Sequence, residues 1–432
     1  MLLEFSVANF KSFKERQTFS LVKNRGKELS ETNTFSVNGP GSIELLRSSS
    51  IYGPNASGKS NLLQAVASMR SLVLTSSKSM QRGDFLDVVP FKLDPNIVTE
   101  PSEFEVIFIA NGVRYQYGFT ATRERVLEEW LFTFPKGNAR RMFARTIDPE
   151  TGKRVWKMGR DITGEKNLWK QATRDNSLFL STAVQLNSET LKPVFDWFST
   201  RLRISSTGGW INTFTATLCA SAQKKIVLDF LKAADLGIED VVVEHKPLDL
   251  AELQSSTPDG LKTLLENLLS AKMEDASSGT PPAIPIIRTV HQSSNGEQVS
   301  FELSDESDGT QKIFALAGPW IDSLKNGYVL FIDELHIHLH PKLVSFLVGL
   351  FHSNKYNRHN AQLIFTTHDT TILSQEIFRR DQIWFCEKNQ EQATQLIPLT
   401  DFHPRKGREN IESAYLSGRY GALPFVGQIK DL

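Results

Sequence analysis

The stretch Gly53-Pro54-Asn55-Ala56-Ser57-Gly58-Lys59-Ser60 decides how the first strand and helix of the core are joined. It matches G-x-x-x-x-G-K-[ST] and follows Ser50-Ile51-Tyr52, which is typical of a strand end. The glycines let successive backbone N–H groups turn inward around an anion, and Lys59 supplies a positive charge. The Ser60 hydroxyl is suited to bind Mg²⁺, and a helix beginning near Asn61 points its positive end at the same place. The stretch predicts a phosphate-binding loop; a chance glycine-rich turn is the alternative.

Two apolar runs far downstream end in polar residues, as buried strands of a parallel sheet do. Residues 328–332 are followed by Asp333 and Glu334, and residues 363–365 lead into the polar cluster that contains His368. We expect Asp333 to hold Mg²⁺ through water, Glu334 to orient or deprotonate the attacking water, and His368 to contact the γ-phosphate. Either run alone is also compatible with an ordinary core strand that ends in a charged turn.

A further segment, Leu303-Ser304-Asp305-Glu306-Ser307-Asp308-Gly309-Thr310-Gln311-Lys312, precedes an apolar-periodic helix. Its central residues resemble a degenerate form of the L-S-G-G-Q signature of ABC-type ATPases. This resemblance implies that Ser307 and N–H groups near Gly309 bind the outer phosphate of a nucleotide held mainly by another subunit. Taken alone, the same residues fit an ordinary N-capped helix.

The N-terminal residues 2–13 resemble the opening strand of the RecF and SMC group of ABC-type ATPases. In that group the corresponding turn lies beside the adenine, so the resemblance implies that Asn9, Lys11 and Ser12 lie there in this chain. The chain is similar to the AAA-family ATP-binding subgroup, which includes ATPase subunits of abortive-infection and other anti-phage systems. The matching stretches are residues 306–310, 333–341 and Gly418-Arg419-Tyr420-Gly421-Ala422-Leu423-Pro424.

The resemblance implies an α/β fold: a P-loop ATPase head with an antiparallel β-lobe and a compact helical insertion. It implies ATP and Mg²⁺ as cofactors, with Lys59, Glu334 and His368 in catalysis. It also implies a homodimer of heads, or a higher homo-oligomer, whose ATP-driven closure controls a separate nuclease or toxin effector. A DNA-repair ATPase like RecF is the alternative, and it predicts DNA-stimulated turnover.

Related nucleases with this ATPase core carry a metal-dependent Toprim domain after the His-ended strand. Here 64 residues of the 432 follow His368, and no suitable carboxylate cluster is visible among them. A domain of that kind needs on the order of 100 residues. We therefore expect an ATPase without nuclease activity of its own.

Composition and pattern suggest four regions. Residues 1–80 are expected to form the first part of the head, 81–160 a β-lobe, 161–280 a helical insertion, and 281–432 the rest of the head. Alternating residues on both sides of Asn111-Gly112 predict a β-hairpin in the lobe, and a second hairpin is predicted around Asn295-Gly296. Apolar positions of the insertion keep no heptad, so a long coiled coil is not expected.

The composition is that of a water-soluble globular protein, with 40% hydrophobic and 23% charged residues. The formal net charge is zero, so nothing in the overall charge favours nucleic-acid binding, although a local basic groove remains possible. Two scattered cysteines, Cys219 and Cys386, fit a reducing compartment, and no run is long enough for a membrane span. We expect a cytoplasmic protein that does not contact membranes.

Two side-chain groups have open interpretations. His336, His338 and His340 alternate and would share one face of an extended segment, as in a metal site; a structural or inter-subunit role is favoured, because no further ligand spacing supports a metal. Arg405, Lys406 and Arg408 form a basic cluster, which fits a solvated loop better than a docking site for a partner or a phosphate backbone.

Overall fold

A computed structural model describes residues 1–37, 42–135, 137–148, 150–205, 212–247, 283–405, 407 and 409–424. The chain divides into two compact units, Met1–Gly209 with Asp322–Leu432, and Trp210–Ile321. The region expected as a helical insertion, residues 161–280, is therefore shared between the two units. Its last part, and the connection expected at residues 276–282, lie outside the described residues.

A mainly parallel sheet forms the centre of the first unit, with strand order β11-β15-β16-β5-β17-β18. Its strands are β5 (Ser48–Tyr52), β11 (Leu202–Ser205), β15 (Val329–Ile332), β16 (Gln362–Thr366), β17 (Ile383–Lys388) and β18 (Thr394–Pro398). All neighbouring pairs are parallel except β17 with β18. The two buried strands predicted before Asp333 and His368 are confirmed as β15 and β16. Because β16 lies between β15 and β5, the carboxyl ends of all three meet at one edge of the sheet.

Helix α2 (Lys59–Thr75) follows β5 directly after the glycine-rich loop and begins two residues earlier than expected. Its buried positions include Leu62, Val66, Met69 and Val73, whose spacing of three or four residues places them on one face. This face belongs to the main apolar core, so the packing of α2 fixes where the loop before it ends.

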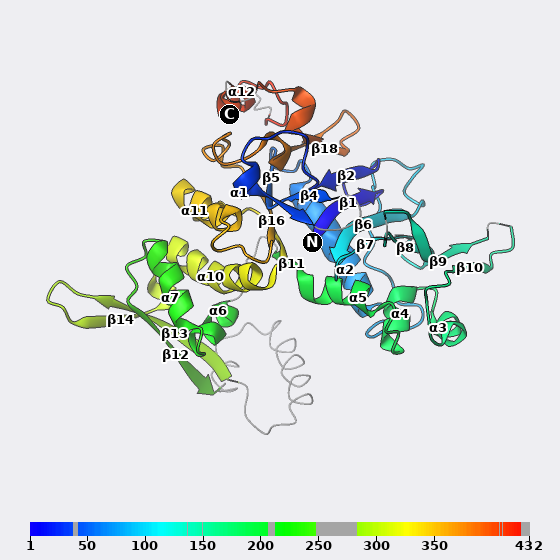
Figure 1. Cartoon of the computed structure of the whole chain (residues 1–432), viewed down its shortest axis with the longest axis horizontal. Helices are drawn as coiled ribbons and strands as arrows, with labels where there is room; N and C mark the ends of the chain where they lie inside the picture. The colour runs from blue at the N-terminus through cyan, green and yellow to red at the C-terminus, as the bar shows by residue number, and fades with distance from the viewer. Residues whose placement is uncertain are drawn as a thin grey trace, which may run out of the picture. The chain divides into compact units, whose positions relative to one another are not determined.

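An antiparallel sheet forms the second layer of this unit, with strand order β10-β9-β8-β7-β6-β1-β2 (Figure 1). Its strands are β1 (Leu2–Ala8), β2 (Gln17–Ser20), β6 (Ser102–Ala110), β7 (Val113–Ala121), β8 (Val126–Thr133), β9 (Arg140–Ile147) and β10 (Arg154–Met158). The predicted hairpin is confirmed as β6 and β7, and its turn residues Asn111 and Gly112 have φ of 50° and 77°. The N-terminal strand pairs with β6, so the expected β-lobe and the chain's first strand share one sheet.

A buried carboxylate joins this sheet to helix α4 (Phe179–Gln185). Glu129 of β8 accepts hydrogen bonds from the backbone amides of Phe179 (2.7 Å) and Leu180 (3.0 Å). Arg145 of β9 lies 2.9 Å from the same carboxylate, and both side chains are almost fully buried. The pair thus neutralises its own charge inside the core.

The second unit contains helices α6 (Asn212–Cys219) and α7 (Lys224–Ala233) and a three-stranded sheet of order β12-β13-β14. These strands are β12 (Asp240–Pro247), β13 (Ala283–Gln292) and β14 (Gln298–Glu302). The hairpin predicted around Asn295-Gly296 is confirmed, because Gln292 pairs with Gln298. Helix α10 (Asp308–Asn326) begins in this unit.

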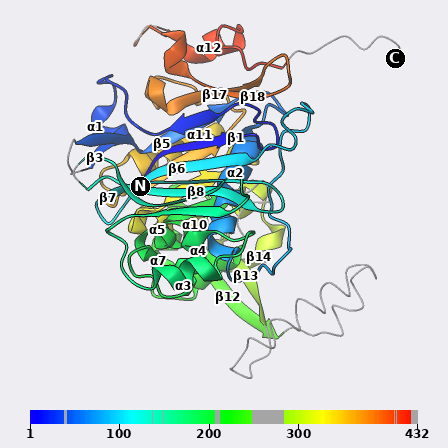
Figure 2. The ribbon, with the colours of Figure 1, turned by 90° about the vertical axis from the view of Figure 1, so that its right-hand side faces the viewer.

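The last described helix of the first unit, α12 (Ile411–Leu416), lies at the same end of the unit as β17 and β18 (Figure 2). None of the helices in the described ranges combines the length and apolar character that a membrane crossing requires.

Candidate nucleotide site

The loop between β5 and α2 is tightly curled and closely surrounded. Gly53 and Gly58 have φ of 155° and 110°. A Cβ on Gly53 would lie 2.1 Å from the carbonyl oxygen of Cys386, and one on Gly58 would lie 2.1 Å from the hydroxyl oxygen of Thr394. Both positions therefore require glycine. The crest between them, from Pro54 through Asn55 to Ala56, is more exposed.

Lys59 is buried and folds back over this loop. Its Nζ donates hydrogen bonds to the carbonyl oxygens of Gly53 (2.8 Å) and Pro54 (2.9 Å). Burial lowers the pKa of Lys59, and the nearby Cys386, Glu334 and Asp333 raise it by smaller amounts. The Ser57 hydroxyl is also buried and has no hydrogen-bond partner in the described part of the chain. A buried cation held only by neutral carbonyls, beside an unsatisfied hydroxyl, fits a binding site for an anion.

The two acidic residues follow β15 and are held by the end of β16. Thr366 donates from Oγ1 to Oδ1 of Asp333 (2.6 Å) and accepts from the backbone amide of Glu334 (2.7 Å). Asp333 is only 4% exposed. Glu334 has a φ of 51°, a left-handed conformation that turns the chain sharply after the strand. The chain therefore turns sharply between the two acidic residues, and Thr366 contacts both of them.

His368 faces Glu334 across the edge of the sheet. Its Nε2 lies 3.8 Å from Oε1 of Glu334, which is too long for a direct hydrogen bond. Burial, together with the charge of Lys59 and the neighbouring His336, lowers the pKa of His368 to about 4, against an opposing effect of Asp333. His368 is consequently neutral near pH 7, so this contact is not an ion pair.

Ser60 and Asn61 lie in the first turn of helix α2, and Asn61 contacts the N-terminal turn. The Asn61 amide donates to the Ser12 hydroxyl (2.7 Å), and the Thr394 hydroxyl lies 2.7 Å from the same oxygen. Thr394 also hydrogen-bonds to the carbonyl oxygen of Ser57 (2.7 Å). Ser12 thus adjoins the phosphate loop through Asn61 and Thr394.

The Asn9 side chain is buried and hydrogen-bonded within the chain, whereas Lys11 is partly exposed. The Asn9 amide donates to the carbonyls of Ile97 (2.9 Å) and Glu100 (2.8 Å), and its Oδ1 accepts from the backbone amide of Phe91 (3.0 Å). The Lys11 ammonium donates to Gln64. The bonds of Asn9, which is buried, tie residues 91–100 to the turn after β1, and the expected adenine contacts of this turn stay a prediction.

The signature-like residues lie in the second unit and form a helix cap. The Ser307 hydroxyl accepts from the backbone amide of Thr310 (3.2 Å) at the start of α10, and Gly309 follows in the first turn. Glu306 is anchored to β13, where His291 lies 2.7 Å from its carboxylate and Thr289 donates to it. The helix-cap alternative is therefore confirmed as the local structure, and a nucleotide contact across subunits stays a prediction.

The three alternating histidines do not share one face of a strand. Residues 335–338 form a turn in which His338 has a φ of 60°, while Nδ1 of His340 accepts from the Lys342 amide (3.2 Å) to cap helix α11 (Pro341–His352). In the described residues there is no group of three His, Cys, Asp or Glu side chains placed to hold a metal. Of the basic cluster, Lys406 and Arg408 lie outside the described residues.

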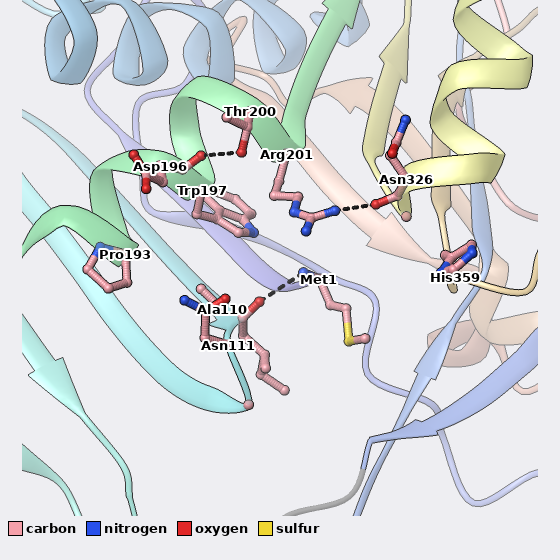
Figure 3. Close-up of a pocket in the computed structure, with 13 residues that line it drawn as sticks. Met1, Ala110, Asn111, Pro193, Asp196, Trp197, Thr200, Arg201, Asn326 and His359 are labelled. Carbon is pink, nitrogen blue, oxygen red and sulfur yellow. Dashed lines mark hydrogen bonds between the residues drawn. The ribbon is translucent and has the colours of Figure 1, made fainter.

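A cavity of about 420 Å³ lies elsewhere on the first unit (Figure 3). Its lining includes Arg201, Asn326 and His359, which precede β11, β15 and β16. The Arg201 guanidinium donates to the Asn326 carbonyl inside it. Residues before parallel strands lie at the edge opposite to the phosphate loop, so this cavity is separate from the candidate nucleotide site.

Sequence reasoning missed two residues of the site, Thr366 and Thr394. Thr366 stands in the polar cluster at the end of its strand, so its position was a usable signal. Thr394 begins β18, hundreds of residues from the loop it contacts, and nothing in its local sequence marks it.

The chain resembles one protein family and several solved structures. A family model described as "AAA domain, putative AbiEii toxin, Type IV TA system" matches residues 48–374. A search among curated proteins returns no match. Similar solved structures include an SMC head domain from Thermotoga maritima, at 14% identity and a TM-score of 0.39, covering 92% of this chain and 98% of that one. Another is an SMC head bound to the C-winged helix domain of ScpA, at 11% identity and a TM-score of 0.40, covering 92% and 96%. A third is an SMC head with an extended coiled coil bound to the C-terminal domain of ScpA derived from Pyrococcus furiosus, at 12% identity and 0.41, covering 93% and 97%.

Proposed function

The chain belongs to the AAA-domain family of that description, and on this premise we propose that it is an ATP-driven switch that controls a separate effector protein in anti-phage defence. It is an AAA ATPase, and its motifs resemble those of the ABC, RecF and SMC group. The observation that carries the proposal is that Lys59, Glu334 and His368 meet at one edge of the parallel sheet, through the strand order β15-β16-β5.

Binding uses the loop and the start of α2. Lys59 exchanges the carbonyls of Gly53 and Pro54 for phosphate oxygens, and the buried Ser57 hydroxyl finds a partner there. Ser60 and Asp333 hold Mg²⁺, which supplies neutralisation of the charge that develops on the phosphoryl group.

Hydrolysis uses the residues after β15 and β16. Glu334 orients the attacking water and accepts its proton. His368 donates a hydrogen bond toward the γ-phosphate and so senses whether it is present. Thr366 keeps Asp333 and the backbone of Glu334 at fixed separation while the proton moves.

Closure of two heads completes the site, with Ser307 and Gly309 of one copy facing the nucleotide of the other. Loss of the γ-phosphate releases this contact, and the change is passed to a bound partner, a nuclease or toxin, in the cytoplasm. The chain itself carries no nuclease activity in this proposal. Its zero net charge gives it no general attraction for DNA.

The test is purification of the Glu334→Gln variant from its native operon with ATP and Mg²⁺, followed by light scattering and mass spectrometry. The variant should retain ATP, because it lacks the base but keeps the binding residues, and should accumulate as closed dimers. Lys59→Ala is the matched control, which should stay open under the same conditions.

A stoichiometric effector bound to Glu334→Gln but absent from Lys59→Ala supports the proposal. Recovery of DNA or repair proteins alone, with turnover stimulated by DNA, would replace it with a RecF-like repair function. If light scattering gives the same molecular mass for both variants, with and without ATP, the dimer switch is refuted.

A further inference from the structure

The C-terminal segment, defined as residues 409–424, has no role in the mechanism above, yet its motif Gly418–Pro424 stands out in the sequence. It consists of α12 and the turn that follows, and it packs on β17 (Figure 2). The contacts of this segment lead to both halves of the nucleotide site.

An aromatic cluster seats the segment next to the phosphate loop. The rings of Tyr415 and Tyr420 both stack on Phe385 of β17, with centroid distances of 5.2 and 5.4 Å. Tyr415 also makes an edge contact, at 6.1 Å, with Tyr52. Tyr52 is the last residue before Gly53, so the segment touches the residue from which the phosphate loop starts.

Polar contacts lock the turn that follows α12. The Ala422 amide donates to Glu387 (2.8 Å), and the Tyr415 hydroxyl donates to the Ala422 carbonyl (2.8 Å). A Cβ on Gly421 would lie 2.5 Å from the same Glu387 carboxylate, at a φ of 63°. The motif's second glycine is thus explained by close approach to β17.

Strand β17 contacts the segment and the phosphate loop with alternate residues. Phe385 and Glu387 face the C-terminal segment, whereas the Cys386 thiol donates to the Ser57 carbonyl (3.4 Å). Successive residues of a strand point to opposite faces, so β17 is clamped between the two.

A second link reaches the loop that carries His368. The Thr370 hydroxyl donates to Oε1 of Glu412 in α12, at 2.9 Å. Thr370 is two residues beyond His368, and the intervening Asp369 closes a small turn by accepting from the Thr371 amide (2.9 Å). The Thr370 bond thus ties α12 to the turn that follows His368. Residues 371–376, which continue this turn, and the segment also line an open cavity of about 460 Å³, which includes Glu376 and Glu412.

We propose that the C-terminal segment couples the nucleotide site to the end of the chain, and that Glu412 is the positioning residue that holds His368 in place through Thr370. The proposal rests on the proposed ATPase function. In this proposal the Gly418–Pro424 motif keeps α12 packed on β17.

The test compares Thr370→Val, Glu412→Ala and the double variant with the wild type, using the full chain. Each single variant should lower kcat for ATP by about tenfold with KM unchanged, as expected when a hydrogen bond to a charged group is lost in positioning and not in binding. The double variant should be no worse than either single one, because both break the same bond. Thr370→Ser keeps the hydroxyl and should have the kcat of the wild type. Glu376→Ala removes a carboxylate of the same cavity and should also leave kcat unchanged.

Hydrogen exchange of residues 367–373 is measured on the same proteins without nucleotide. Faster exchange there in Thr370→Val and Glu412→Ala, but not in Glu376→Ala, supports the coupling whether or not the protein turns over. Unchanged exchange, additive losses in the double variant, or a change in KM alone overturns it. If the wild type and Lys59→Ala hydrolyse ATP equally slowly, the proposed function fails, and the exchange result still decides whether α12 holds the His368 turn.

Discussion

The hydroxyl of Thr366 bridges the two acidic residues of the site, donating to the Asp333 carboxylate at 2.6 Å and accepting from the Glu334 amide at 2.7 Å. One buried side chain at the end of β16 thereby sets the geometry after β15. This relationship exists because the two strands are parallel neighbours, with Ile332 paired to Phe365.

Thr366→Val should lower kcat for ATP hydrolysis by roughly 10- to 100-fold, because a buried carboxylate loses a charge-assisted hydrogen bond. The Mg²⁺ concentration needed for half-maximal activity should rise as well. Steady-state assays over a range of Mg²⁺ concentrations check this. Thr366→Ser keeps the hydroxyl and should behave like the wild type; equal losses in both variants would point to packing instead.

Gly58→Ala should weaken ATP binding by roughly tenfold or more, since the new methyl group meets Thr394 at a left-handed backbone conformation. Titration with a fluorescent ATP analogue measures the affinity. Gly83→Ala is a matched control, because Gly83 also has a positive φ but nothing within 4 Å of its Cβ position. Similar effects of the two substitutions would show that close approach is not the cause.

Glu129→Ala should lower the free energy of unfolding by about 3–5 kcal/mol, because it leaves Arg145 charged and unpaired in the core. Denaturant unfolding of the two proteins gives the difference. The exposed pair Arg140 and Asp161, 3.9 Å apart, offers the comparison. Asp161→Ala should change stability by less than about 1 kcal/mol; a larger loss there than for Glu129→Ala would contradict the expectation.

His352 should make the fold sensitive to acid. Burial, with a smaller contribution from Arg47, lowers its pKa to about 3, and its Nε2 lies 2.7 Å from the Ser48 hydroxyl. The unfolded chain binds this proton near pH 6.5 and the folded chain does not, so the stabilisation is complete above pH 6.5 and is lost as the pH falls toward 3.

Between pH 7 and pH 4.5 the wild type should therefore lose roughly 3 kcal/mol of unfolding free energy through this group. His352→Gln removes the titrating ring and should show a loss smaller by about that amount. Denaturant unfolding at both pH values measures how much unfolding free energy each protein loses. Equal losses in the two proteins would rule out His352 as the cause.

Local chemistry made the main motifs predictable. Each of these motifs depends only on residues that are contiguous in the chain, so the sequence alone predicts it. The examples are the positive φ at Gly53 and Gly58, the lysine between loop and helix, and the acids after an apolar run. The two hairpins were predictable for the same reason, because Asn-Gly favours a tight turn.

Other features depend on segments that are distant in the sequence. Asn9 is buried and its amide binds the carbonyls of Ile97 and Glu100, while its place beside the adenine stays a prediction. No local pattern predicts these partners, because they lie about ninety residues further along the chain.

The sequence by itself determined the α/β class, the phosphate loop and the identity of the acids and histidine that follow two strands. Only the tertiary structure decided that β16 lies between β15 and β5, which puts Thr366 against Asp333, and that α12 packs on β17, which puts Glu412 against Thr370. Motifs reflect the steric and hydrogen-bonding requirements of residues that are neighbours in the sequence. Strand order and helix docking depend on burying apolar surface over the whole unit, so they are decided only when the chain is packed.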